Sequence, residues 1–507
     1  MSESGDVEEP VPLHKPAFRA LVRSLVIAAL AVGVATPSAH ALDLGFNDLD
    51  MQRYAGWFSG PADPAALNAG MAHSREAGAN VHRFMLVWNE VASQTTTPSA
   101  TEAADPSWPG YSWEKVDLEV KAIVAHGMVP VSWVARAPTW AEGPDRPAVS
   151  TLVPRGTWKP SAPALRQFAI AIGKRYSGTF PDPAAPGQTL PKMDTFQAWN
   201  EPNLYTEITP QWERSGDTWK MSSAAQYRNL ATAFSAGIKS VQPAAKVLSA
   251  GTAPFGDLNP GEPRIPPALF YRELLCESVK DGKIRVRKSC AKLPIDGWAH
   301  HTYPIGPPTR SARNVDDVVV PDLGKLTVLM DAAAKAKVVS SAAAKNLWMT
   351  EMSWDSFPDP NGLSLEDHAL YMQGAFYVLW KAGANTIIWW NSRDERKGDD
   401  WNVTLQSGIF RRGANETDPN QDIRKPSWTA FHFPFVAYRA KGVATLWSRA
   451  PGAGDVAVEA KTGAGWTRVA TLTSRGGQVF AGRLRVGVGT ELRAVQGAET
   501  SLTWTTF

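Results

Sequence analysis

The sequence predicts a (β/α)₈ barrel followed by a small all-β sandwich domain. From Leu42 to about Ala440, short apolar runs alternate with helical patterns, which is typical of βα units and a parallel sheet. After Ala440, short strand-like runs separated by Gly-rich turns replace this alternation. A barrel of this kind needs about 250 residues, so a chain of 507 residues leaves room for long loops and a second domain.

Eight apolar runs are predicted to be the barrel strands, because each is short and bounded by turn-forming residues. They span residues 44–46, 81–88, 128–133, 195–199, 246–250, 295–299, 346–350 and 386–390. Helices are expected between them. One begins at Asp63-Pro64, an N-cap followed by a first-turn proline, and ends at Gly78. A second helix begins near Ser161, and a third covers about 227–241. In both, apolar residues recur at helical spacing.

The segments that follow the predicted strands are long and rich in Pro, Gly and Trp. They cover about 89–112, 135–160, 202–221, 302–318, 352–363 and 391–425. Because the loops after the strands of such a barrel form its catalytic face, this asymmetry predicts a binding cleft there.

The predicted domains are an export signal at residues 1–41, the barrel at 42–440 and the sandwich at 441–507. Short strands are expected at 456–458, 467–469, 479–480, 484–486 and 492–494. The sandwich either supports the barrel or binds carbohydrate. It lacks a clear run of aromatic residues, which favours the supporting role.

The N-terminus resembles a secretion signal. Basic residues precede an apolar run at 25–35, and Ala39-His40-Ala41 offers a small-x-small cleavage site. The run is too short for a membrane-spanning helix, which needs about 20 residues. We therefore expect a secreted protein, either free or associated with the cell surface, without an integral span once the signal is removed. The alternative is a retained membrane-proximal anchor.

Cys276 and Cys290 are the only cysteines. In an exported protein, two cysteines this close are expected to form a disulfide that closes a surface loop. The alternative is two unrelated thiols.

Composition and motifs exclude several classes of function. A net charge of +3 without a block of like charges argues against nucleic acid as a partner. No His-x-x-x-His pair, nucleotide-binding glycine loop or Gly-x-Ser-x-Gly elbow occurs, so no metal, cofactor or serine triad is predicted. The 21 tryptophans fit a core, but they also suit a carbohydrate partner, because sugar C–H faces stack on aromatic rings.

Two glutamates end predicted strands of the barrel. Glu201 follows the fourth strand within Trp199-Asn200-Glu201-Pro202-Asn203, and Glu351 follows the seventh. Both are expected on the catalytic face. Cleavage of a glycosidic bond needs such a pair, with one acid to protonate the leaving oxygen and one carboxylate to meet the oxocarbenium-like centre. The alternative for either residue is a structural ion pair.

On these residues the chain resembles the clan A glycoside hydrolases, which are TIM barrels, and is similar to families 39 and 5. The resemblance covers residues 42–440. It implies that Glu201 is the acid/base and Glu351 the nucleophile. It also implies a set of substrate-binding positions: Arg83, Asn200, His301, Tyr303, Trp390 and, from the third strand, Trp133. The Trp-Asn-Glu-Pro-Asn form and Tyr111-Ser-Trp113…Asp117 favour family 39.

Some of these assignments leave alternatives. His300 is an equal candidate to His301 for the substrate-binding position, and Trp389 is an alternative to Trp390.

An ionised Glu351 nearby is expected to raise the pKa of Glu201 and keep it protonated. Arg83 is expected to favour ionised Glu351.

The sequence therefore predicts a retaining glycoside hydrolase acting on plant or microbial polysaccharides or oligosaccharides. A xylosidase-like or arabinosidase-like activity competes with a glucanase-like or mannanase-like one. The alternative class is a non-catalytic carbohydrate-binding or cell-wall protein on an inactive barrel. The sugar, the linkage, exo or endo action and the oligomeric state are left open.

Overall fold

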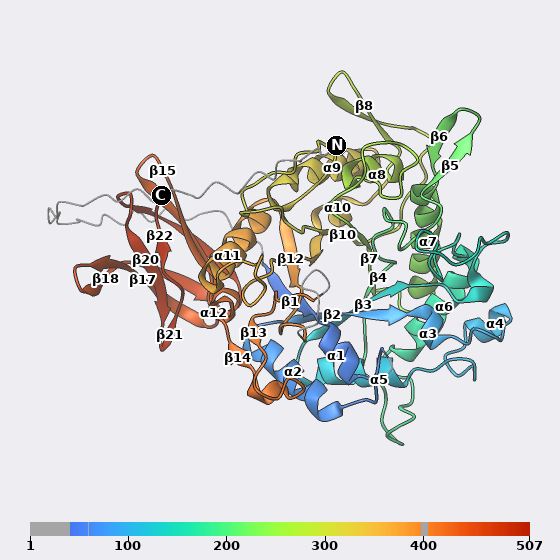
Figure 1. Ribbon diagram of the computed structural model, residues 1–507, viewed down its shortest axis with the longest axis horizontal. Coiled ribbons are helices and arrows are strands. Elements are labelled where there is room, and N and C mark those ends of the chain that lie inside the picture. The colour runs from blue at the N-terminus through green and yellow to red at the C-terminus, as the bar shows by residue number, and fades with distance from the viewer. Residues whose placement is uncertain (1–40, 59, 397–403) are drawn as a thin grey trace, which may run out of the picture.

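The computed structural model describes residues 41–58, 60–396 and 404–507. Eight parallel strands close into a barrel in the order β1-β12-β11-β10-β7-β4-β3-β2, with helices around it (Figure 1). The predicted fold is confirmed, and each predicted strand overlaps one barrel strand. Their bounds are β1 Asp43–Asn47, β2 Val81–Val87, β3 Val129–Ala135, β4 Thr195–Gln197, β7 Lys246–Thr252, β10 Gly297–His301, β11 Leu347–Glu351 and β12 Ala384–Trp389.

The helices begin where local capping chemistry allows. In α2 the Asp63 carboxylate accepts from the Ala66 N–H at 3.0 Å, Pro64 occupies the first turn, and Gly78 follows the helix with a φ of 98°. The helices are α1 Leu49–Tyr54, α2 Pro64–Glu76, α3 Trp88–Val91, α4 Ala100–Ala103, α5 Glu114–Ala125, α6 Ala162–Arg175, α7 Ser223–Val241, α8 Pro267–Leu274, α9 Gly324–Lys335, α10 Ser341–Lys345, α11 Leu365–Lys381 and α12 Pro426–His432.

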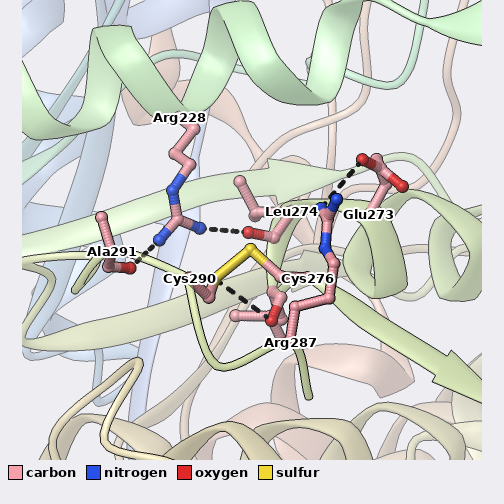
Figure 2. The surroundings of a disulfide bond; sticks show 8 residues. Arg228, Glu273, Leu274, Cys276, Arg287, Cys290 and Ala291 are labelled. Carbon is pink, nitrogen blue, oxygen red and sulfur yellow. Dashed lines mark hydrogen bonds and ion pairs between the residues drawn. A yellow bond between two sulfur atoms is a disulfide. The ribbon is translucent and has the colours of Figure 1, made fainter. Parts of the chain in front are cut away.

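Three two-stranded hairpins interrupt the βα repeat: β5–β6 (Trp212–Ser215, Thr218–Met221), β8–β9 (Glu277–Lys280, Lys283–Val286) and β13–β14 (Phe410–Arg411, Ile423–Arg424). The predicted disulfide is present at the base of β8–β9, with the Cα atoms of Cys276 and Cys290 5.9 Å apart (Figure 2). The Arg228 guanidinium donates to the carbonyls of Leu274 and Ala291 on either side of it, so the disulfide loop is also held to α7 (Figure 2).

Two antiparallel sheets form the C-terminal part, beside α11 and α12 in Figure 1. One contains β15 Phe435–Ala440, β16 Val443–Arg449 and β19 Val479–Arg485. The other contains β17 Ala453–Thr462, β18 Gly465–Arg475, β20 Glu491–Gln496, β21 Glu499–Thr500 and β22 Trp504–Thr505. The first sheet takes in residues 435–440, which precede the boundary expected at 441. The runs expected at 479–480 and 484–486 are one strand, β19.

The sheets pack directly on the barrel. The Tyr377 ring of α11 stacks on Tyr438 of β15 at a centroid distance of 5.0 Å, and Trp504 lies 5.0 Å from Tyr438. Arg449 donates to the carbonyls of Leu42 and Gly78, both at 3.2 Å. The ring contact of Tyr438 ties the sandwich to α11, and the Arg449 bonds tie it to the beginning of the barrel chain.

The predicted signal segment lies outside the described residues. Within the described part of the chain, no helix has the length and apolar character needed to cross a bilayer.

Candidate active site

The inward-facing residues of the barrel strands place the site. Val81, Val131 and Ala299 belong to a small buried cluster that fills the barrel interior. Successive side chains of a strand point to opposite faces, so the residue two positions later points inward again. Arg83, Trp133 and His301 therefore project into the barrel one layer closer to the catalytic face.

Glu351, the last residue of β11, is held by two donors. The Arg83 Nη1 atom lies 2.7 Å from its Oε1 atom, and the Tyr303 hydroxyl donates to its Oε2 atom at 3.1 Å. Only 9% of the Glu351 side chain is exposed. The expected contact between Arg83 and Glu351 is present.

Arg83 is fully buried and organises the polar layer. Its Nε atom donates to Gln197 and its Nη2 atom to Asn200, both at 2.8 Å. Its guanidinium lies 4.9 Å from the centroid of the Trp133 ring, within range of a cation–π contact. The guanidinium thus links strands β2, β3, β4 and β11 through one rigid group.

Glu201 follows β4 in a turn with unusual backbone angles. The φ angles are 73° at Trp199 and 30° at Glu201, a region that non-glycine residues rarely adopt. The Glu201 N–H donates to the Gly251 carbonyl of β7 at 2.9 Å, which fixes the turn. The side chain retains 18% exposure, so it can reach a ligand.

Burial raises the pKa of Glu201 to about 7, and the positive charge of Arg83 opposes this rise. The sequence-based explanation assigned the raised pKa to the neighbouring Glu351 charge. In the structure the dominant cause is the loss of water around the carboxyl group.

His301 contacts Glu201 directly. Its Nδ1 atom lies 2.7 Å from Glu201 Oε1 and 3.5 Å from Glu351 Oε2. Burial lowers the pKa of His301 to about 4, so the ring is neutral at pH 7. Gly251 leaves room for the ring, because a Cβ atom at that position would lie 2.2 Å from the His301 Nε2 atom.

His300 faces the opposite side of β10 and is fully buried. Its Nδ1 atom pairs with the Thr252 hydroxyl at 2.8 Å and its Nε2 atom with the Val318 carbonyl at 2.9 Å. With both ring nitrogens occupied, His300 has a structural role. The alternation of β10 therefore selects His301 for the site.

The alternation of β12 separates the two candidate tryptophans in the same way. Trp389 is fully buried, donates to the Ser407 carbonyl at 2.7 Å and stacks on Trp354. Trp389 is therefore part of the core. Trp390, which follows the strand, is only partly buried and stays the candidate for contact with substrate.

Glu201, His301 and Glu351 each offer a ligand atom within 4.8 Å of the others, the one such cluster of possible metal ligands in the described ranges. Arg83 and Tyr303 already occupy both oxygens of Glu351. A cation bound there would be repelled by the positive charge of Arg83. The arrangement therefore fits a pair of catalytic carboxyl groups better than a metal site.

Sequence reasoning missed Gln197 and Glu207. Gln197 accepts from Arg83, and its position on β4 shortly before Glu201 was the available signal. Glu207 lies in the loop after β4, 3.5 Å from the Arg136 Nη2 atom. Burial raises the pKa of Glu207 to about 8, with smaller contributions from the charges of Glu201 and Glu351. No sequence pattern marks a loop residue of this kind.

No protein-family model matches the sequence, and no curated protein matches it. Among solved structures, the chain is similar to a family 39 glycoside hydrolase from Bacteroides cellulosilyticus WH2, with a TM-score of 0.51, 14% identity, and coverage of 89% of this chain and 81% of that chain. It also matches the family 39 enzyme from Xanthomonas axonopodis pv. citri (TM-score 0.46, 14% identity, 89% and 94% coverage). A family 5 subfamily 18 enzyme from Streptomyces cattleya, solved with GlcNAc, matches with a TM-score of 0.46, 14% identity, and 78% and 80% coverage.

Identities this low show the fold and do not transfer activity. The protein therefore has a (β/α)₈ barrel that is similar in fold to the family 39 glycoside hydrolase from Bacteroides cellulosilyticus WH2.

Proposed function

We propose that the protein is a secreted retaining glycoside hydrolase with Glu201 as acid/base and Glu351 as nucleophile. One observation carries the proposal: two carboxyl groups of different character face each other in the barrel mouth. Glu201 has a pKa of about 7 because it is buried, whereas Glu351 is paired with the Arg83 guanidinium. Environments that separate two carboxyl groups in this way assign one as the acid and the other as the carboxylate.

The separation of the two groups supports retention of configuration. Oxygens of Glu201 and Glu351 lie within 4.8 Å of each other. Retaining enzymes hold their carboxyl groups about 5–5.5 Å apart, whereas inverting enzymes leave about 6.5–9.5 Å for a water molecule. Oxygens this close favour the retaining arrangement.

In the first step, a Glu351 oxygen attacks the anomeric carbon while the bond to the leaving oxygen breaks, and Glu201 transfers its proton to that oxygen. The product is a glycosyl ester of Glu351, whose negative charge is consumed. Glu201 is now ionised. In the second step it takes a proton from water, the water oxygen attacks the anomeric carbon, and Glu351 leaves as a carboxylate.

The surrounding residues have specific tasks in this scheme. In the neutral tautomer that carries its proton on Nδ1, His301 donates to Glu201 Oε1, which leaves the acid proton on Oε2. Asn200 accepts from Arg83 through its Oδ1 atom, so its NH₂ group is the part that can donate to a substrate hydroxyl. Tyr303 keeps Glu351 aligned, and the partly buried Trp390 offers an aromatic face toward the sugar. Trp133, predicted to bind substrate, is buried against the Arg83 guanidinium and supports the site through that contact.

The experiment is an azide rescue of two variants with product anomers read by NMR. Glu351→Ala cannot form the ester and should lose activity on all substrates by several orders of magnitude. Glu201→Ala should still be glycosylated by aryl glycosides with acidic phenols, and the ester should then accumulate. Azide needs no deprotonation, so it should rescue Glu201→Ala with retention and Glu351→Ala with inversion. Identical rescue products, or full activity in either variant, would contradict the assignment.

We extend the proposal to localisation, domains and substrate. The substrate is a plant or microbial glycan, and a panel of aryl glycosides and polysaccharides will distinguish xylosidase-like or arabinosidase-like from glucanase-like or mannanase-like activity. We also propose export by the segment 1–41, with the barrel at 42–440 and the sandwich at 441–507 as the mature parts. The test of export is whether the mature protein, found outside the cell, begins near Leu42.

A further inference from the structure

A cleft of about 460 Å³ lies between the loop after β7 (253–266) and the loop after β10 (302–318). We call it the β7–β10 cleft. Its lining includes apolar residues, two arginines and one carboxylate: Phe255, Leu258, Ile305, Arg310, Arg313 and Asp317. A volume of this size falls within the range of small-molecule sites, roughly 300–1,000 Å³.

The β7–β10 cleft belongs to the same face of the barrel as the candidate active site, because both of its loops follow barrel strands. Thr252 ends β7 directly after Gly251, whose carbonyl accepts from the Glu201 N–H. The other loop begins after His301 and contains Tyr303. The β7–β10 cleft and the two glutamates therefore lie on the same face of the barrel.

The two loops are joined to each other, so the cleft is part of the folded structure. The Val318 N–H donates to the Pro254 carbonyl at 3.0 Å, and the Gly256 N–H donates to Asp317 at 3.1 Å. These bonds join the two loops directly, and Gly256 and Asp317 also line the cleft.

The charge of the cleft is unbalanced. Neighbouring arginines are paired with acids: Arg264 lies 2.5 Å from Asp257 and Arg272 lies 2.6 Å from Asp316. In contrast, the exposed guanidinium groups of Arg310 and Arg313 form no ion pair or side-chain hydrogen bond with any residue in the described ranges.

Asp317 is the single carboxylate among the lining residues, against the two guanidinium groups of Arg310 and Arg313. It is 8% exposed, and its Oδ1 atom already accepts from the Gly256 N–H and from the Asn314 amide at 3.2 Å. Its carboxylate is therefore engaged in holding the loops together.

The apolar lining adds a second requirement for the ligand. Leu258 is 78% exposed, and the partly buried side chains of Phe255 and Ile305 lie on the cleft wall. A ring with C–H faces and an attached anionic group would satisfy both features. A planar guanidinium binds carboxylate or sulfate oxygens in a bidentate way, which a neutral sugar cannot reproduce.

We propose that the β7–β10 cleft is a subsite for an anionic sugar residue of the glycan substrate, recognised by Arg310 and Arg313. The inference rests on the proposed glycosidase function and names its substrate class as acidic glycans. The anionic group is a carboxylate, as in a uronic acid, or a sulfate ester, and the experiment distinguishes the two.

The test measures binding without turnover, by calorimetry on the full-length Glu351→Ala chain. One pair of probes is a glucuronic-acid-bearing xylo-oligosaccharide and its carboxyl-reduced neutral form. The other is a sulfated galactan oligosaccharide and its desulfated form. We expect at least one acidic probe to bind about tenfold or more tightly than its neutral partner, and Arg310→Gln with Arg313→Gln to abolish the difference.

The matched control is Arg468→Gln with Arg485→Gln, two exposed arginines of the sandwich that give the same change in net charge. This variant should keep the preference. Equal binding of acidic and neutral probes, or equal loss of preference in both double variants, would overturn the inference. Failure of the proposed function is separate: it would appear as absence of glycoside hydrolysis by the unaltered protein, whatever the binding preference.

Discussion

Raising the pH through the pKa of Glu201 is expected to remove the acid form that protonates the leaving group. That pKa is about 7, compared with an ordinary value of 4.5. At pH 7 about half of the molecules then hold the proton, whereas an ordinary glutamate would hold it in about one molecule in 300. Burial thus increases the acid form by about two orders of magnitude at neutral pH.

The assay is the pH dependence of kcat/KM on a glycoside with a poor leaving group. We expect an alkaline limb centred near pH 7, with a tenfold fall for each pH unit above it. The limb should be lost in Glu201→Gln and retained in Glu207→Gln. It should also flatten with an acidic phenol as leaving group, because that reaction needs no proton. A limb that survives in Glu201→Gln would refute the assignment of the acid.

The same raised pKa has a cost in stability. The unfolded Glu201 loses its proton near pH 4.5 and the folded one near pH 7, so between these values the folded state holds more protons. Stability therefore falls as the pH rises from 4.5 to 7, by about 3 kcal/mol in total. Glu201→Gln should unfold at a higher temperature than the unaltered protein at pH 8, and at a similar temperature at pH 4. An equal difference at both pH values would contradict this reasoning.

Three further predictions concern the supporting residues. Arg83→Met leaves the buried Glu351 carboxylate without its ion-pair partner. We therefore expect the free energy of unfolding, measured by denaturant titration, to fall by about 3–5 kcal/mol, together with a fall in kcat. Unchanged stability would show that the ion pair with Glu351 does not stabilise the fold. His301→Asn should shift the alkaline limb of kcat/KM, whereas His300→Asn should lower the Tm and leave the limb in place; the opposite pattern would reverse their roles. Cys276→Ser with Cys290→Ser should lower the free energy of unfolding by about 3 kcal/mol and leave kcat/KM unchanged, because the disulfide closes a short loop outside the catalytic pair. A lower kcat/KM without a loss of stability would show that this loop acts on the site.

The order of elements and the position of the two glutamates follow from the sequence alone. Short apolar runs alternating with helical patterns determine the barrel, because each pattern is local and needs no knowledge of distant contacts. Glu201 and Glu351 could be placed on one face for the same reason: each follows a strand, and parallel strands end at the same side of a barrel.

Choices between adjacent residues needed the tertiary structure. His300 and His301 are adjacent at the end of one apolar run, so the sequence does not say which of them faces inward. Only the register of β10 in the closed barrel places His301 beside Glu201. The same holds for Trp389, the last residue of β12, and Trp390, which follows it.

The electrostatics of the site also came from the tertiary structure, because burial depends on residues far apart in the chain. The raised pKa of Glu201 comes from lost water, and the sequence pointed instead to the charge of Glu351. Glu207 and the unpaired Arg310 and Arg313 could not be predicted, since whether a loop charge meets a partner is decided when separate loops come together. The sequence determines which side chains stand at the barrel mouth, and the packing of the loops decides their charge and their access to substrate.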